Sequence, residues 1–315
     1  MTALAPASLS VPSSLKSRPL GREFNARRTV LRTGMGVVKV TAASKIAAPK
    51  LARTWSNPNG EILTEVVPQQ LWVAQRPFVW NGIDVGGKMA VVKLTDGTLW
   101  VHSPVHLDGD LRAELAALGE VKHVVSPNFE HVKYASEWIQ EFPSAHAYAC
   151  PGLREKKPDI RFSADICDDN NETPAQWPAE IDVSFFDCER NPFTKQPFFN
   201  EVVFFHAPSG SLIVTDLWWN WPSKKVPRQT WLWKQGMDLV FLPFYRNLMV
   251  PANQKAAFHA AVDRVLTWPF RRIVPCHGVV TPDAPDQSER SHALFRNHLL
   301  EGIPSSGSLP DNYHP

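Results

Sequence analysis

Apolar and polar positions alternate along the chain in patterns that separate predicted strands from predicted helices. Two apolar segments, KMAVVKL and TLWVHSPV, flank Asp96-Gly97, a pair that favours the tight turn of a β-hairpin. A second hairpin is predicted in NEVVFFHAPSGSLIVTDL, where a turn at 208–210 separates two apolar runs. Short apolar runs predict further strands in QLWVAQRPF, VKHVVS, AHAYACPG and RRIVPCHG.

Three segments show the three- to four-residue apolar spacing of amphipathic helices: LDGDLRAELAALG, VKYASEWIQEFP and NQKAAFHAAVDRVLTW. In the first, Asp108 or Asp110 is the predicted N-cap and Gly119 the stop. Residues 151–196 are polar and give no clear assignment. The order of strands and helices predicts an α/β (α+β) fold in which helices cover sheet layers, within a single domain of about 250 residues.

The composition agrees with a globular domain, because 43% of the residues are hydrophobic and 20% are charged. No stretch approaches the roughly 18 unbroken apolar residues of a membrane-spanning helix. The four cysteines are widely spaced and form no CxxC pair. Neither a structural zinc site nor a disulfide framework is therefore expected.

The net charge of +2 hides a difference between the first 60 residues and the rest. Residues 1–60 contain ten of the 33 basic residues and one of the 31 acidic residues, so the remainder has 23 basic and 30 acidic residues, a net charge of −7. An acid-poor segment rich in Ser and Arg is typical of an organelle transit peptide. We expect residues 1–42 to be a disordered chloroplast transit peptide or a disordered tail, and 43–60 a flexible segment. The acidic remainder argues against nucleic acid as a partner.

Polar side chains recur where predicted buried strands end. They are Ser103, the loop from Asn128 to His131, Asp216 and His277. Ligand sites of layered α/β proteins gather where strand ends meet loops, and histidines with carboxylates suit a divalent metal ion. Any one of these residues alone is more commonly a capping or turn residue. The hypothesis of a metal site depends on their shared position at the ends of predicted strands.

The order of elements resembles the metallo-β-lactamase superfamily, an αββα sandwich of metal-dependent hydrolases and oxidoreductases. The first metal loop of that family reads His-x-His-x-Asp-His, and in register this chain has Ser126, Asn128, Glu130 and His131. The resemblance implies one degraded metal site and one retained site for zinc, iron or manganese. The retained ligands would be Glu130, His131, Asp216 and His277.

Longer motifs resemble a narrower family, the uncharacterised domain-of-unknown-function family 4336. They include RPFVWNGIDVGGKMAVVKL, VSPNFEHVKYASEW, TDLWWNWP and PCHG, and they extend over about residues 60–280. Plant and algal members of that family usually carry plastid signals, which implies a location in the chloroplast stroma. We place the metallo-β-lactamase-like domain at residues 61–285, followed by a C-terminal helix and tail at 286–315.

The register of the second predicted hairpin decides which further residues can reach the site. If His206 pairs with Ser211, then Glu201 lies opposite Asp216, and His206 lies about 17 Å from Asp216, too far to share an ion with it. Two carboxylates about 5 Å apart repel each other, so a cation or a shared proton is expected between them. Glu201 is therefore an additional candidate ligand, which a register slip of one residue would remove.

Two functions remain open at this point. The first is a plastid metal-dependent hydrolase of an unidentified small molecule, in which Asn128 donates a hydrogen bond to an oxyanion. The second is a non-catalytic binding or assembly factor, motivated by the loss of the two histidines at Ser126 and Asn128. The tryptophan-rich segment from Trp218 to Trp233 would then contact a protein or membrane surface, although large rings more commonly pack as a cap on the fold.

Overall fold

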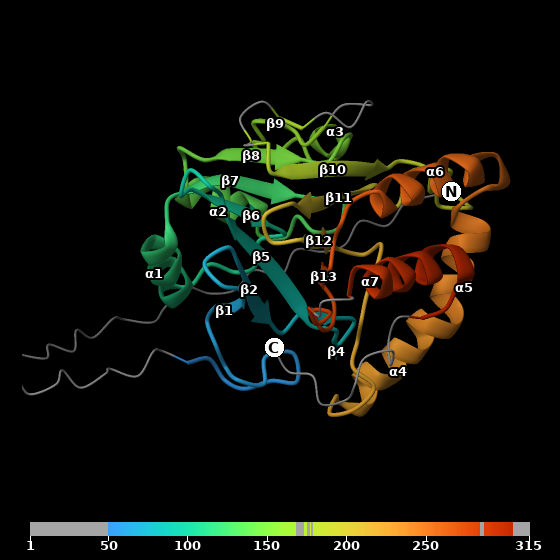
Figure 1. Cartoon of the computed structure of the whole chain (residues 1–315), viewed down its shortest axis with the longest axis horizontal. Helices are drawn as coiled ribbons and strands as arrows, with labels where there is room; N and C mark the ends of the chain where they lie inside the picture. Colours follow the sequence, from blue (N-terminus) through green and yellow to red (C-terminus); the bar gives the residue numbers. More distant parts are fainter. Residues whose placement is uncertain (1–49, 168–172, 175–176, 178, 284–286, 305–315) are drawn as a thin grey trace, which may run out of the picture. The chain divides into compact units, whose positions relative to one another are not determined.

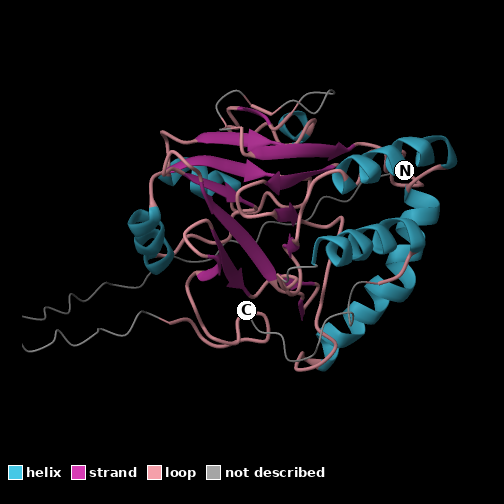
Figure 2. Cartoon of the chain, in the orientation of Figure 1, coloured by secondary structure: helices cyan, strands magenta, loops and turns pink. Residues whose placement is uncertain are grey.

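Two stacked β-sheets form the centre of the domain, with helices outside both of them (Figures 1 and 2). The computed structural model describes residues 50–167, 173–174, 177, 179–283 and 287–304. The expected transit peptide lies outside the described residues, as do residues 43–49 of the expected flexible segment. Residues 50–60 were also expected to be flexible, but Trp55 donates a hydrogen bond to Asp84 and Asn57 donates one to the carbonyl of Gln75. This part of the segment is therefore anchored to the domain.

The first sheet has seven strands among the described residues, in the spatial order β1-β2-β5-β6-β7-β8-β9. Their bounds are β1 Thr64–Val67, β2 Leu71–Arg76, β5 Gly87–Lys93, β6 Leu99–His102, β7 Val121–Ser126, β8 His146–Ala149 and β9 Ala164–Asp165. The strands β1 to β6 pair antiparallel, and β6 to β9 pair parallel. Parallel neighbours need a crossover, which the helices α1 (Gly109–Leu118) and α2 (Ala135–Glu141) supply.

The second sheet has four strands in the order β10-β11-β12-β13, and a short hairpin is formed by β3 (Val79–Trp80) and β4 (Ile83–Asp84). The four strands are β10 Ile181–Phe186, β11 Glu201–His206, β12 Ser211–Val214 and β13 Arg272–Pro275. His206 pairs with Ser211, which confirms the predicted hairpin register, and β13 runs parallel to β12. The strand β10 lies in the polar region that the sequence left unassigned.

Of the remaining described helical segments, one lies between β8 and β9, six lie between β12 and β13, and two follow β13. They are α3 Leu153–Lys156, α4 Arg228–Gly236, η1 Met237–Phe241, α5 Leu242–Phe244, η2 Tyr245–Met249, η3 Ala252–Gln254, α6 Lys255–Leu266, α7 Gln287–Arg296 and η4 Asn297–Glu301. The segments from α4 to η2 follow one another without a break, and no helix was predicted there. Among the described residues, no helix combines the length and the apolar character needed to cross a bilayer.

Successive residues of one strand serve different cores, because side chains alternate between the two faces of a sheet. Val92 of β5 packs in the cluster between the sheets with Phe204 of β11, whereas Val91 packs outward with Leu111 of α1. On the other side, Phe205 of β11 packs outward in a third cluster with residues of α6 and α7. These three apolar layers confirm the expected αββα sandwich.

Candidate metal centre

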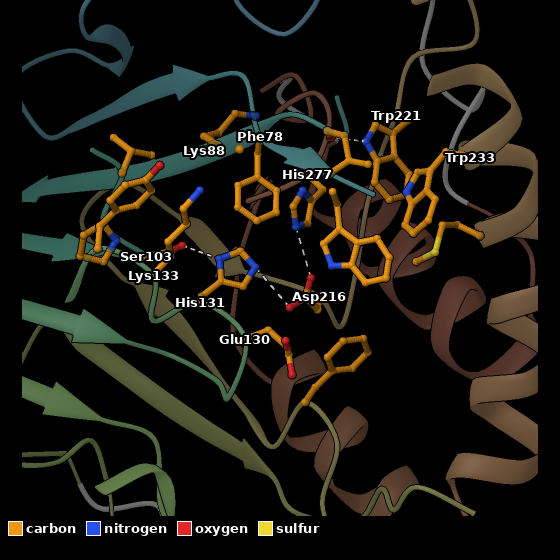
Figure 3. Close-up of a pocket in the computed structure, with 18 of the residues that line it drawn as sticks. Phe78, Lys88, Ser103, Glu130, His131, Lys133, Asp216, Trp221, Trp233 and His277 are labelled. Carbon is orange, nitrogen blue, oxygen red and sulfur yellow. Dashed lines mark hydrogen bonds and ion pairs between the residues drawn. The ribbon is translucent and has the colours of Figure 1, made fainter. Parts of the chain in front are cut away.

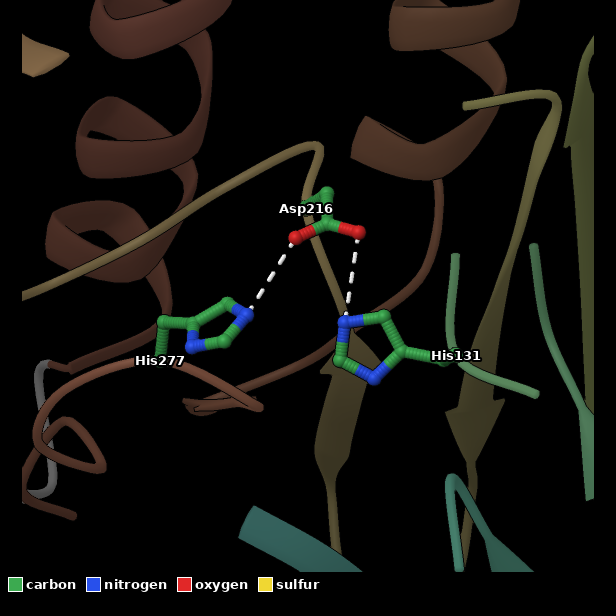
Figure 4. Close-up of side chains that lie close together, drawn as sticks. All are labelled: His131, Asp216 and His277. Carbon is green, nitrogen blue, oxygen red and sulfur yellow. Dashed lines mark ion pairs between the residues drawn. The ribbon is translucent and has the colours of Figure 1, made fainter. Parts of the chain in front are cut away.

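His131, Asp216 and His277 meet at one end of the sandwich (Figure 4). The Nε2 atom of His131 lies 3.2 Å from Oδ2 of Asp216, and Nε2 of His277 lies 3.3 Å from Oδ1 of the same carboxylate. One ligand atom from each of the three residues lies within 4.8 Å of the others. The three side chains, although distant in sequence, can therefore surround one ion.

The sheet topology explains why these residues converge. Val214 of β12 pairs with Pro275 of the parallel strand β13, so Asp216 and His277, two residues further along, leave the sheet at the same edge. His131 belongs to the loop after β7 of the other sheet. That loop is held by the side-chain oxygen of Asn128, which accepts hydrogen bonds from the backbone N–H groups of Glu130 and His131.

Both histidines are oriented through their Nδ1 atoms. The Nδ1 of His131 lies 2.6 Å from the Ser103 hydroxyl, and the Nδ1 of His277 donates to the carbonyl of Gly86 over 2.7 Å. Ser103 adopts a φ of 53°, a left-handed backbone conformation that is uncommon for serine and that is often retained at functional sites. Hydrogen bonds at one ring nitrogen commonly fix the other nitrogen toward a metal ion. Here they direct both Nε2 atoms to Asp216.

The donor set fits a divalent cation. A carbonyl oxygen carries no proton, so the bond to Gly86 requires the hydrogen on Nδ1 of His277, and in the neutral ring Nε2 then presents a lone pair to the Asp216 carboxylate. A proton or a metal ion must lie between them to make this contact favourable. The two imidazoles contact different oxygens of Asp216, at 3.2 and 3.3 Å, close to the separation of about 3.3 Å between ligands of a tetrahedral zinc ion.

The electrostatics of the group are dominated by its one carboxylate. Burial alone would raise the pKa of Asp216, but the neighbouring His131 and His277 hold it well below its usual value. Burial alone would lower the pKa of His131, but the charge of Asp216 raises it well above the usual value. Asp216 is thus an anion at every pH of interest, and it attracts a cation.

Asn128 and Glu201 are fully engaged beneath this group. The Asn128 amide nitrogen lies within hydrogen-bond distance of Glu201 (3.1 Å), Thr215 (2.9 Å) and Asp216 (2.8 Å). The Glu201 carboxylate also accepts hydrogen bonds from three backbone N–H groups at residues 215–217. Glu201 does lie beside Asp216 as predicted, but an amide rather than a cation lies between the two carboxylates. These contacts occupy the polar atoms of both side chains, which argues against Glu201 as a metal ligand and against Asn128 as a donor to an oxyanion.

The other candidates lie apart from the three ligands. Glu130 has an exposed side chain and is not among the three residues that converge, although it lines the same pocket. Ser126 is completely buried. His206 contacts Ser209 at the other end of the hairpin, in agreement with its predicted distance from the site.

A cavity of about 370 Å³ opens above the three ligands (Figure 3). Apart from the ligands, its wall is largely aromatic and also contains two lysines and one further carboxylate. The principal lining residues are Phe78, Trp80, Lys88, Ser103, Glu130, Lys133, Tyr134, Phe199, Trp221, Trp233 and Phe241. The sequence indicated Ser103 and Glu130, but it gave no signal for Lys88 or for the β3–β4 hairpin with Phe78 and Trp80.

The tryptophan-rich segment is mainly an internal cap. Trp218, Trp219 and Trp221 are 0%, 3% and 2% exposed, and the indole of Trp221 donates to the carbonyl of Val85. Among the tryptophans of this segment only Trp231 is strongly exposed, at 42%. Lys224, Lys225, Arg228 and Leu232 of the same segment are also exposed, so its first three tryptophans cap the fold while its later residues face solvent.

A family model named domain of unknown function (DUF4336) matches residues 68–228, just over half of the chain. The chain belongs to this family. His131 and Asp216 lie inside the DUF4336 match, and His277 follows it. No curated protein matches the sequence.

Solved structures similar to this DUF4336 protein include several metallo-β-lactamases. FIM-1 from Pseudomonas aeruginosa in its mono-zinc form is 15% identical, with 82% of this chain and 100% of that chain covered and a TM-score of 0.47. A metallo-β-lactamase from Pontibacter korlensis is 12% identical, with 75% and 98% covered and a TM-score of 0.46. One from Erythrobacter litoralis is 13% identical, with 75% and 96% covered and a TM-score of 0.49. The αββα architecture is established by the stacked sheets themselves.

Proposed function

We propose that this DUF4336 protein is a metal-dependent hydrolase that uses one divalent ion held by His131, Asp216 and His277. The observation that carries the proposal is the orientation of the two imidazoles, whose Nδ1 atoms are bound by Ser103 and Gly86 and whose Nε2 atoms face one carboxylate. Three protein ligands with a free position are typical of catalytic rather than structural sites.

A bound ion of this kind supplies an acidified water and polarises the group that is hydrolysed. The residues of the chain would orient the substrate and handle protons. Of the two carboxylates that line the pocket, Asp216 contacts the histidines, whereas the exposed Glu130 carboxylate is bonded to no described side chain. We assign Glu130 the role of proton acceptor, since its carboxylate faces the pocket and is open to a proton from water or substrate.

Metal analysis of the purified protein tests this proposal. Two imidazoles and one carboxylate favour zinc, with iron and manganese as alternatives. We expect about one metal ion per chain in the wild type and none in the His131→Ala/His277→Ala double variant. His259→Ala is the matched control, because this histidine is exposed on α6. Substoichiometric metal in the wild type, or unchanged metal in the double variant, would refute the proposal.

The alternative of a non-catalytic factor is less well supported at Trp218, Trp219 and Trp221, because these three tryptophans are buried. A surface contact is better supported on the helical segment from α4 to η2. Its exposed side chains include Trp231, Leu232, Leu239, Val240 and Leu248, and Lys225 and Arg228 lie exposed at its start. The acid of this segment, Asp238, is buried against Lys234.

An apolar outer face with basic residues at one end is the pattern of a helix that lies on an anionic lipid surface. We therefore propose that this face contacts such a membrane surface. Flotation with vesicles that contain anionic phospholipid should recover the wild type but not a Trp231→Ser/Val240→Ser variant. Binding to neutral vesicles alone, or equal binding of both proteins, would contradict it.

We also propose a chloroplast location, which is supported by the acid-poor, Arg- and Ser-rich residues 1–42. A fluorescent protein fused after residue 60 should enter plastids, and the same fusion without residues 1–42 should not. Import of both fusions, or of neither, would contradict the proposal.

A further inference from the structure

Lys88 of β5 is a buried cation beside the candidate metal centre. Its side chain lines the pocket, and the residue is only 4% exposed. The ammonium group donates to the carbonyl of Gly278, which follows the ligand His277. Among the described residues, no carboxylate lies within 4.0 Å of the Lys88 ammonium, and no second acceptor is found for its three N–H bonds.

A buried ammonium normally has a carboxylate or several acceptors, because removing its water is costly. Burial lowers the pKa of Lys88 to about 8, so the charged form still predominates at pH 7. The Lys88 ammonium is thus a buried positive charge with no carboxylate partner among the described residues, and it lies at the wall of a cavity that a ligand can enter. An anion supplied by the ligand would satisfy the remaining N–H groups.

The rest of the wall indicates what the ligand carries besides its anion. Phe78, Tyr134, Phe199 and Trp221 supply apolar ring surface, and a cavity of about 370 Å³ is within the range of small-molecule sites. Lys133 lies at the rim, with its ammonium 5.4 Å and 5.1 Å from the ring centroids of Phe78 and Tyr134. The wall therefore suits a ring or acyl group more than a sugar.

We propose that Lys88 binds the anionic group of the substrate, and that the substrate is an amphiphile with an apolar or aromatic body and one carboxylate or phosphate. This proposal rests on the proposed hydrolase function only in treating the bound anion as a substrate. The binding site itself needs no metal ion, since Lys88 and the aromatic wall belong to the chain.

Binding of small probes to chelator-treated protein tests the proposal by calorimetry and by tryptophan fluorescence. The probes are naphthylacetate, naphthylmethyl phosphate and the neutral naphthylethanol, which share one ring and differ in charge. We expect at least one anion to bind about ten- to hundredfold more tightly than the alcohol, as for a hydrogen bond to a charged group. Comparison of the two anions distinguishes a carboxylate site from a phosphate site.

Lys88→Met should remove this preference and leave the affinity for the alcohol within about threefold, because the apolar chain is retained. Lys133→Met is the matched control, and it should reduce anion binding by no more than about threefold, since this lysine is exposed. If the acid and the alcohol bind equally to the wild type, the proposal is overturned even if Lys88→Met does not fold.

Failure of the two proposals can be told apart. Anion binding that requires metal, and that depends on His131 and His277 but not on Lys88, overturns the Lys88 site and leaves the metal centre intact. Anion binding that depends on Lys88, by a wild type in which metal analysis finds no ion, supports the Lys88 site and removes the hydrolase proposal.

Discussion

Replacing Asn128 by alanine removes the side chain that separates two buried carboxylates. The Asn128 amide nitrogen lies 3.1 Å from Glu201 and 2.8 Å from Asp216, and the residue is completely buried. Hydrogen bonds to charged groups contribute about 1.5–3 kcal/mol each, so losing two of them should cost about 3–6 kcal/mol. Natural domains are stable by about 5–15 kcal/mol, and the variant should therefore fold but be markedly weakened.

Asn191→Ala is a matched control for this change. The side-chain oxygen of Asn191 accepts hydrogen bonds from the backbone N–H groups of Phe193 and Thr194, two and three residues further along the chain. The side-chain oxygen of Asn128 accepts the same pair of bonds from residues 130 and 131. No described carboxylate lies within hydrogen-bond distance of the Asn191 amide. Its loss should therefore cost only about 1 kcal/mol.

Urea unfolding of chelator-treated protein, followed by circular dichroism, measures both free energies of unfolding. The chelator matters because a metal ion on Asp216 would itself offset the repulsion between the carboxylates. Equal losses for Asn128→Ala and Asn191→Ala would refute the reasoning, since both variants lose the same pair of backbone hydrogen bonds and only Asn128→Ala also loses the buried contacts to Glu201, Thr215 and Asp216.

Three further predictions concern the same end of the sandwich. Burial and a neighbouring negative charge raise the pKa of Glu201 from 4.5 to about 7, so folding favours its protonated form. The contribution of Glu201 to the stability of metal-free protein should be greatest below about pH 4.5 and should fall by about 3 kcal/mol as the pH rises through 7. Glu201→Gln should remove this fall. Ser103→Ala should lower metal affinity about ten- to hundredfold in a chelator competition, because a histidine ligand loses its orienting partner; unchanged affinity contradicts this. Gly278→Ala should abolish metal binding, because the φ of Gly278 is +95° and a Cβ there would overlap the carbonyl of Asn220. In the control Gly97→Ala the φ is +84° but nothing lies within 4 Å of the added Cβ. This control should lose only about 1–2 kcal/mol of stability and keep the metal. Metal retained in Gly278→Ala would show that the loop tolerates the shift.

Local patterns predicted much of the fold, because each buried strand and amphipathic helix is encoded in a few neighbouring residues. The Asp96-Gly97 hairpin and the pairing of His206 with Ser211 follow from turn residues and strand length. Strand β10 was not predicted, because Ile181–Phe186 lies in a polar region and is defined mainly by its pairing with β11. The helical segment after Pro227 was not predicted, because the tryptophans around it were read as one loop, whereas Trp231 and Trp233 lie on the helix α4.

The convergence of His131, Asp216 and His277 could be predicted because strand ends determine where these residues lie, although Glu130, predicted with them, does not join the group. Their hydrogen-bond partners could not be predicted. Ser103 was recognised by its position after a strand, but its bond to His131 depends on the packing of two separate loops. The bond from His277 to Gly86 joins residues 191 positions apart and involves a backbone carbonyl, which has no side-chain signal. Lys88 likewise follows two glycines in an unremarkable strand, and only the closed fold shows that its charge is buried.

The carboxylate pair shows why proximity of acids alone does not indicate a metal ion. The predicted nearness of Glu201 and Asp216 is confirmed, and an amide and three backbone N–H groups stabilise the pair. The raised pKa of Glu201 favours the expected proton over the expected cation between the two groups. On the other side of Asp216, the Gly86 carbonyl holds a hydrogen on Nδ1 of His277, so a proton or a metal ion must lie between Nε2 and the carboxylate. Hydrogen-bond donors surround the contact between Glu201 and Asp216. The contact between Asp216 and Nε2 of His277 has no such donor among the described residues. The ion is therefore expected between the histidines, and Asn128 holds the carboxylate in place from below.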